Sequence, residues 1–144
     1  MSRRATNWIV LHCSATRAVQ DIGAADIRKW HKAQGWKDIG YHYVIRRNGK
    51  IETGRAANVA GSHVKGHNHD SVGICLVGGL NNKTFAPENN FTPAQWASLK
   101  TLVARLARQY PKAKVLGHRD FPGVQKACPC FNAKTWARRN KFPT

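Results

Sequence analysis

The chain has 144 residues, enough for one domain with a sizeable core, since 42% of them are hydrophobic and five are tryptophans. Lysine and arginine outnumber aspartate and glutamate by 24 to 7, for a formal net charge of +17. That charge favours polyanionic partners such as nucleic acid, an anionic membrane surface or an acidic cell-wall polymer. No run of about 18 apolar residues is present, which excludes a transmembrane helix.

Four cysteines are present: Cys13, Cys75, Cys128 and Cys130. The N-terminal segment MSRRATNWIVLHCS lacks the long apolar run of a signal peptide. A protein made in the cytosol without such a signal keeps its thiols reduced. We therefore expect the cysteines to be metal ligands or buried side chains rather than a disulfide framework.

The first part of the chain predicts an arm, a strand and a helix. Residues 1–6 are polar and basic and predict a loose arm. The apolar, β-branched run NWIVLH (residues 7–12) predicts a buried strand. Residues 22–34 show helical spacing, with Ile27 and Trp30 on the inward face.

A hairpin and a long loop follow. Residues 43–47 and 50–53 predict two strands joined by Asn48-Gly49 in a type I′ turn. Residues 55–71 are rich in glycine, histidine, asparagine and serine, and we expect a loop with little regular structure.

The second half of the chain has the strongest helix signal. The run VGICLV (residues 72–77) predicts another buried strand. Thr92 as N-cap, Pro93 at the first helical position and Gln95 two residues further on form a capping box. Phe91 and Trp96 are spaced for a hydrophobic staple, and the apolar face that follows extends the helix to about Tyr110.

A last strand over residues 114–118 and a short helix over residues 132–140, with Trp136 turned inward, complete the elements. The order strand, helix, hairpin, strand, helix, strand, helix predicts an α/β fold. We expect a single domain over residues 1–144, with a central mixed β-sheet flanked by helices. No internal repeat or linker divides the chain.

Candidate metal ligands lie at the ends of two predicted strands. His12 ends the first strand and His118 ends the last, and ligand sites in α/β sheets gather where strands end. Cys128 follows His118 on a loop that is able to fold back. Two imidazoles and a thiolate form a three-ligand set, and catalytic zinc sites use three protein ligands and keep a fourth position for water.

The other cysteines have simpler interpretations. Cys13 follows His12 on a strand, so its side chain faces the opposite side, toward the core. Cys75 lies within an apolar run and is expected to be a small buried hydrophobe. Cys130 follows Cys128 across a proline, and both a fourth ligand and a free neighbour remain open. Spacing alone also leaves open that these histidines and cysteines are satisfied core residues.

Five segments in order along nearly the whole chain resemble one known family. They are VLHCSAT (10–16), IRKWHKAQGWKDIGYHYVIRRNG (27–49), GSHVKGHNHDSVGICLVGG (61–79), FTPAQW (91–96) and KACP (126–129). The chain resembles the amidase-type phage lysozymes (endolysins), which are zinc-dependent N-acetylmuramoyl-L-alanine amidases. These enzymes share a fold with the animal peptidoglycan recognition proteins.

The resemblance implies one zinc ion bound by His12, His118 and Cys128, with Tyr41 and Lys126 as catalytic residues. The implied reaction cleaves the amide bond between N-acetylmuramic acid and L-alanine. Zinc lowers the pKa of its bound water and polarises the scissile carbonyl. Lys126 would stabilise the oxyanion, and Tyr41 would hydrogen-bond the water or the tetrahedral intermediate.

Each of these residues also has a simpler interpretation without a role in catalysis. Tyr41 fits an ordinary strand tyrosine, and Lys126 is one of many basic residues. His63, His67 and His69 lie in the glycine-rich loop, which we expect to line the substrate rather than to form a second metal site. Of the three, His63 is the expected substrate-binding residue.

Two tryptophans, Trp30 and Trp36, are expected in the core rather than as sugar-binding platforms. The chain also departs from the family pattern. The family often has glycine where this chain has Cys130. In addition, the loop between His118 and Cys128 is longer than in the phage lysozyme pattern, which bears on the position of Lys126.

The resemblance implies a bacteriolytic peptidoglycan hydrolase made in the host cytoplasm, which acts on the cell wall after another protein permeabilises the membrane. Its expected partner is bacterial peptidoglycan, and the high charge also fits anionic wall polymers or lipopolysaccharide. Two alternatives are a non-catalytic peptidoglycan-binding module and a regulatory binder that inhibits the phage RNA polymerase. Because no nucleic-acid reader motif is present and basic residues are scattered, we expect no stable nucleic acid complex. We also expect a monomer.

Overall fold

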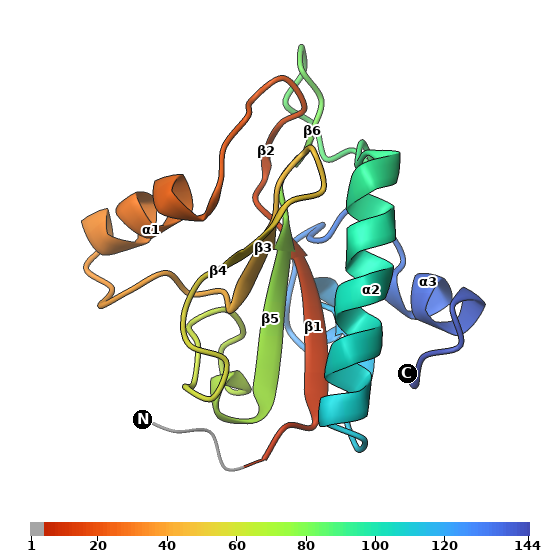
Figure 1. The fold of residues 1–144 in the computed structure, drawn as a ribbon. Helices are drawn as coiled ribbons and strands as arrows, with labels where there is room; N and C mark the ends of the chain where they lie inside the picture. The colour runs from red at the N-terminus through yellow and green to blue at the C-terminus, as the bar shows by residue number, and fades with distance from the viewer. Residues whose placement is uncertain (1–4) are drawn as a thin grey trace.

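A five-stranded sheet with the order β4-β3-β5-β1-β7 forms the centre of the computed structural model, which describes residues 5–144 (Figure 1). The strands of this sheet are β1 (Trp8–Cys13), β3 (Tyr43–Ile45), β4 (Ile51–Thr53), β5 (Ser71–Leu76) and β7 (Lys114–Gly117). The remaining elements are β2 (Thr16–Arg17), β6 (Gly79–Leu80), α1 (Ala24–Ala33), α2 (Pro93–Gln109), α3 (Ala133–Arg139), and the 3-10 turns η1 (Asn68–Asp70) and η2 (His118–Asp120). The arm expected over residues 1–6 falls mostly on residues 1–4, which lie outside the described residues.

Strand β1 lies between β5 and β7 and runs parallel to both. Strand β3 is parallel to β5, and β4 is antiparallel to β3, so the predicted mixed sheet is confirmed. Residues 9–13 of β1 are all buried, as is typical of parallel strands covered on both faces. Within residues 5–144, no helix has the length and apolar character needed to cross a bilayer.

The alternation of side chains along β1 separates a helix-covered face from a polar one. Ile9, Leu11 and Cys13 belong to the main core cluster, where they pack with residues of α2 and α3. Helix α2 crosses this face of the sheet (Figure 1). His12 points the opposite way, because successive strand residues face opposite sides. The predictions that Cys13 faces the core and that Cys75 is buried are both confirmed.

The start of α2 follows its sequence signals. The Thr92 hydroxyl accepts a hydrogen bond from the Gln95 amide, and the Gln95 side-chain oxygen accepts one from the Thr92 amide. The rings of Phe91 and Trp96 meet edge to face with centroids 5.8 Å apart, so the staple is also confirmed. The fully buried Gln95 side chain also donates to the carbonyls of Ile45 and Val77. This one amide therefore anchors the helix to the sheet.

The hairpin is confirmed, but its predicted type I′ turn is wrong. A type I′ turn needs positive φ at both central residues, and of Asn48 and Gly49 only Gly49 has it, with φ 88°. The Gly49 amide donates to the Arg46 carbonyl, and Ile45 pairs with Ile51. This is the pattern of a longer hairpin loop, in which a turn is followed by a glycine bulge.

The core positions predicted for Trp30 and Trp36 are wrong, since the two residues are 42% and 39% exposed. In α1 only Ala24 and Ile27 are buried, because the helix contacts the sheet through its first turns and then projects away from it (Figure 1). Trp36 lies beyond the end of α1. The short β2–β6 pair was not predicted, since two-residue strands carry no periodic signal.

The Gln95 side chain makes four hydrogen bonds, since its oxygen also accepts one from Arg47, and they predict a large effect of Gln95→Leu. Leucine has a similar volume to glutamine, but it cannot form these hydrogen bonds. The Thr92 amide and the carbonyls of Ile45 and Val77 therefore lose the Gln95 side chain as a partner. We expect the free energy of unfolding to fall by about 2–4 kcal/mol. Urea unfolding followed by tryptophan fluorescence measures the loss. The exposed Thr101→Ala on the same helix is the control, with an expected loss of about 0.5 kcal/mol or less. Equal losses in the two variants would contradict this role of Gln95.

Candidate metal centre

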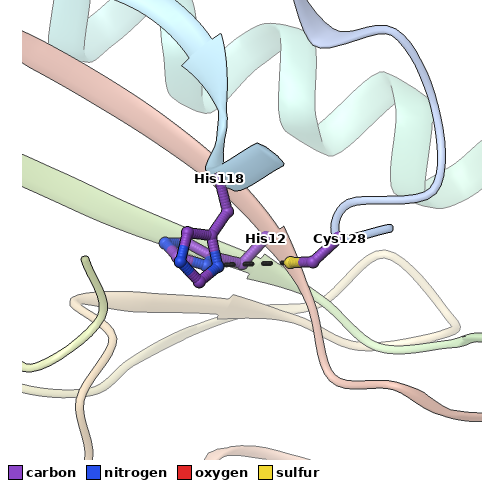
Figure 2. A group of neighbouring side chains, drawn as sticks. All are labelled: His12, His118 and Cys128. Atoms are coloured by element: carbon purple, nitrogen blue, oxygen red, sulfur yellow. Dashed lines mark hydrogen bonds between the residues drawn. The ribbon is translucent and has the colours of Figure 1, made fainter. Parts of the chain in front are cut away.

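Three side chains of metal-ligating type converge at the carboxyl ends of β1 and β7. One ligand atom each from His12, His118 and Cys128 lies within 4.8 Å of the others (Figure 2). Because β1 and β7 are parallel with Leu11 opposite Gly117, the next residue of each chain segment lies at the same edge of the sheet. The two imidazole rings are consequently 4.7 Å apart between centroids.

Cys128 reaches this edge on the loop that precedes α3. Its carbonyl accepts a hydrogen bond of 2.9 Å from the Arg119 amide, and its sulfur accepts one of 3.2 Å from the Cys13 amide. The same sulfur is 3.8 Å from Nδ1 of His12 (Figure 2). An amide hydrogen directed at the sulfur stabilises the thiolate form, which is the form that binds metal.

The electrostatics of the site keep both imidazoles neutral. Burial lowers the pKa of His12 well below its ordinary value of 6.5, and the nearby His63, His118 and Lys126 lower it further. Burial, followed by the charge of Lys126, also lowers the pKa of His118. A neutral imidazole retains the lone pair that a metal ligand needs, so these histidines suit metal binding at neutral pH.

The donor set fits zinc in a site that stays open. Two imidazole nitrogens and one thiolate are ligands that zinc prefers, and three protein ligands leave one coordination position for water or substrate. Cys130 does not join the group. Its sulfur lies 3.8 Å from the Cys13 sulfur and 3.4 Å from the Gly79 carbonyl oxygen. Hydrogen bonding to Cys128 raises the pKa of Cys13 to about 12, so Cys13 remains a thiol.

A cleft of about 310 Å³ is lined by two of the three candidate ligands, His118 and Cys128, and by Tyr41 and Lys126. The Tyr41 ring lies 5.0 Å from the His12 ring between centroids. Burial, and then the neighbouring cysteine sulfurs, raise the pKa of the Tyr41 hydroxyl well above its ordinary value of 10.0. That hydroxyl therefore stays protonated and is a hydrogen-bond donor.

Two further lining residues, His31 and Trp36, were not singled out as site residues from the sequence. Their rings are 4.5 Å apart, and Nδ1 of His31 accepts a hydrogen bond from the Gly40 amide. A sequence signal was available, because the segment WHKAQG ends in a glycine that stops the helix and releases Trp36 from it. The half-exposed Trp36 is one wall of the cleft.

The histidines of the glycine-rich loop lie in different places. His63 lines the cleft, but its ring is buried and its Nδ1 is 2.8 Å from Nε2 of His12. His67 packs edge to face against Trp8 and beside Phe121, and it does not line the cleft. His69 stacks on His67. Across residues 5–144, His12, His118 and Cys128 form the one group of side chains with metal-binding geometry.

Comparisons with known proteins agree with this architecture. A sequence model of the N-acetylmuramoyl-L-alanine amidase family matches residues 2–131. An endolysin of Klebsiella phage KP32 is 50% identical over 142 residues, which cover 99% of this chain and 92% of that protein. The chain belongs to the N-acetylmuramoyl-L-alanine amidase family.

Solved structures show the same fold. The N-acetylmuramoyl-L-alanine amidase LysC from Clostridium intestinale is 30% identical, with a TM-score of 0.77, covering 94% of this chain and 85% of that one. A mutant of Drosophila PGRP-LB in complex with tracheal cytotoxin is 26% identical, with a TM-score of 0.79, covering 100% of this chain and 87% of that one. The expected fold shared by phage amidases and peptidoglycan recognition proteins is therefore confirmed.

The geometry predicts that the protein binds one zinc ion per chain and that Cys128→Ser weakens this binding. Losing one of three ligands should raise the zinc dissociation constant by roughly 100-fold or more. This exceeds the effect of losing a residue that only hydrogen-bonds to a ligand. Competition with a chromophoric chelator measures the constant. Cys130→Ser is the matched control on the same loop and should bind zinc like the wild type. Equal weakening in both variants would exclude Cys128 as the specific ligand.

Proposed function

We propose that the protein is a zinc-dependent peptidoglycan hydrolase of the endolysin type, which cleaves the amide bond between N-acetylmuramic acid and L-alanine. The observation that carries the proposal is the three-ligand group, two members of which, His118 and Cys128, line a cleft together with Tyr41 and Lys126. Membership in the amidase family supports the same reaction. A module that only binds peptidoglycan has no need of an open metal position.

His12, His118 and Cys128 would hold the zinc ion. Zinc in such a site supplies a water nucleophile at neutral pH and a Lewis acid for the carbonyl. Cys128 acts as a ligand, so no side-chain nucleophile is required. The hydrogen bond from the Cys13 amide orients the sulfur of Cys128.

Tyr41 and Lys126 would stabilise the negative charge that develops on the carbonyl oxygen. The Tyr41 hydroxyl keeps its proton, because burial raises its pKa, and it is therefore a hydrogen-bond donor. Lys126 contributes a positive charge close enough to lower the pKa of both imidazoles. Tyr41 is partly buried, where such an interaction is stronger than in water, whereas Lys126 is exposed.

The surface charge supports attraction to the anionic wall. With a formal net charge of +17, the chain should be drawn to anionic wall polymers or lipopolysaccharide, and the lytic rate should fall as salt screens that attraction. A lytic rate unaffected by salt would contradict this part of the proposal.

Comparing lysis of intact cells with that of membrane-permeabilised cells tests whether the protein needs a permeabilising partner to reach the wall from the host cytoplasm.

A digest of purified peptidoglycan tests the proposed reaction. We expect new α-amino groups of alanine to appear, and to be lost with a chelator and in Cys128→Ser, because both remove the metal centre. New reducing sugar ends in place of alanine amines would mean a glycosidase. Zinc binding with neither product would favour a peptidoglycan-binding module or a regulator of the phage RNA polymerase.

The roles of Tyr41 and Lys126 predict losses in turnover with zinc retained. Tyr41→Phe and Lys126→Met should each lower kcat by about 100-fold, the usual effect of removing one donor to an oxyanion, with little change in KM. The alanine-release assay gives the rates, and metal analysis gives the zinc content. Lys100→Met, on the distant α2, is the control for loss of one positive charge. A fall in zinc content that matches the fall in rate would contradict these catalytic roles.

A further inference from the structure

A row of buried polar groups continues behind the metal centre. Nε2 of His12 is 2.8 Å from Nδ1 of His63, and Nε2 of His63 is 3.1 Å from the Ser71 hydroxyl oxygen. That hydroxyl in turn donates to the His67 carbonyl at 2.7 Å. The three side chains are at most 8% exposed. Water therefore has little access to these hydrogen bonds, and each proton must be matched by an acceptor within the protein.

The direction of every proton in this row follows from its last member. The His67 carbonyl only accepts, so the single hydrogen of the Ser71 hydroxyl is directed at it. The Ser71 oxygen then accepts from Nε2–H of His63. In a neutral imidazole the other nitrogen carries the lone pair, so Nδ1 of His63 accepts from Nε2–H of His12.

The consequence for His12 is a fixed tautomer. With its proton on Nε2, the lone pair lies on Nδ1, and Nδ1 is the atom 3.8 Å from the Cys128 sulfur. The opposite arrangement would need either a proton on both nitrogens of His63 or a Ser71 hydroxyl turned from the His67 carbonyl to Nε2 of His63. The first buries a positive charge, which is costly, and the second gives up the 2.7 Å hydrogen bond to the His67 carbonyl. Both would also move the His12 proton to the nitrogen that faces the metal position.

The His63 ring is held in place by its surroundings. A Cβ atom on Gly73 would lie 2.7 Å from Nδ1 of His63, and one on Gly61 would lie 2.8 Å from its Cδ2. The ring thus fills space that only glycine leaves free. The side-chain oxygen of Asn68 accepts from the amides of His63 and Val64, which fixes the backbone as well. This rigidity suits a residue that orients another side chain.

We propose that His63 is a positioning residue for the metal centre, which together with Ser71 keeps Nδ1 of His12 unprotonated and directed at the zinc ion. The expectation that His63 binds substrate stays a prediction beside this role. The inference rests on the proposed zinc site. It adds that metal affinity depends on a hydrogen-bonded residue that is not itself a ligand.

A second buried histidine provides the matched control. His42 lies beside His63, with ring centroids 5.7 Å apart. Its Nε2 is 2.7 Å from the Val59 carbonyl, and its Nδ1 accepts from the Gly73 amide at 3.0 Å. Both ring nitrogens bond to the backbone, so His42 supports the fold without orienting His12. Replacing it tests the loss of a buried imidazole from the same region.

The first measurement is the zinc dissociation constant of the full chain in four variants. His63→Leu should weaken zinc binding by about 10–100-fold, the effect typical of losing an outer-shell partner. His63→Asn should recover part of the loss, because its side-chain oxygen can accept from Nε2–H of His12. Ser71→Ala should weaken binding less than His63→Leu. His42→Leu should lower the melting temperature but leave the zinc constant within about threefold of the wild type.

The second measurement reads the tautomer directly. The ¹⁵N chemical shifts of His12 in the zinc-free wild type should report a proton on Nε2, and in His63→Leu a growing share on Nδ1. The proposal is overturned if wild-type His12 carries its proton on Nδ1. It is also overturned if His63→Leu weakens zinc binding no more than His42→Leu does. A wild type that binds no zinc would instead refute the proposed function, and the tautomer would still be read from the same spectra.

Discussion

The parallel pairing of β1 with β7 is the constraint on which the candidate site depends. The two strands are far apart in sequence, yet their register places Leu11 opposite Gly117, so the chain segments leave the sheet at the same edge. His12 and His118 therefore meet without any long loop having to position them (Figure 2). The strand pair is buried under α2 and α3 on its other face, so the packing energy of the core also holds the two imidazoles in place.

The same sheet edge combines burial with hydrogen bonding. Burial keeps both candidate ligand histidines neutral, and it would be costly if their polar atoms had no partners. For His12 the partner is His63, whose ring occupies the space over Gly73 on the neighbouring strand β5. For Cys128 the partner is the amide of Cys13. The site is thus connected to the sheet on both sides through groups that are not ligands themselves.

Local signals in the sequence predicted local structure well. The α2 start was correct down to the capping box and the Phe91–Trp96 contact, because these interactions join residues within one turn of helix. Errors arose where the answer depended on distant packing. Trp30 has helical spacing with Ile27, but α1 projects from the sheet and leaves it exposed. The Asn48-Gly49 pair marks a turn, but the register of the flanking strands selected a longer loop than a type I′ turn needs.

The sequence by itself determined the mixed α/β fold, the alternation that separates Cys13 from His12, and the set of residue types that suits zinc. The resemblance carried by segments such as KACP and VLHCSAT added the family and its reaction. Only the tertiary structure decided that Trp36 forms a wall of the cleft and that His63 bonds to His12. The physical reason is that hydrogen bonds and burial between residues distant in sequence depend on how the strands and loops pack together, which no local pattern specifies.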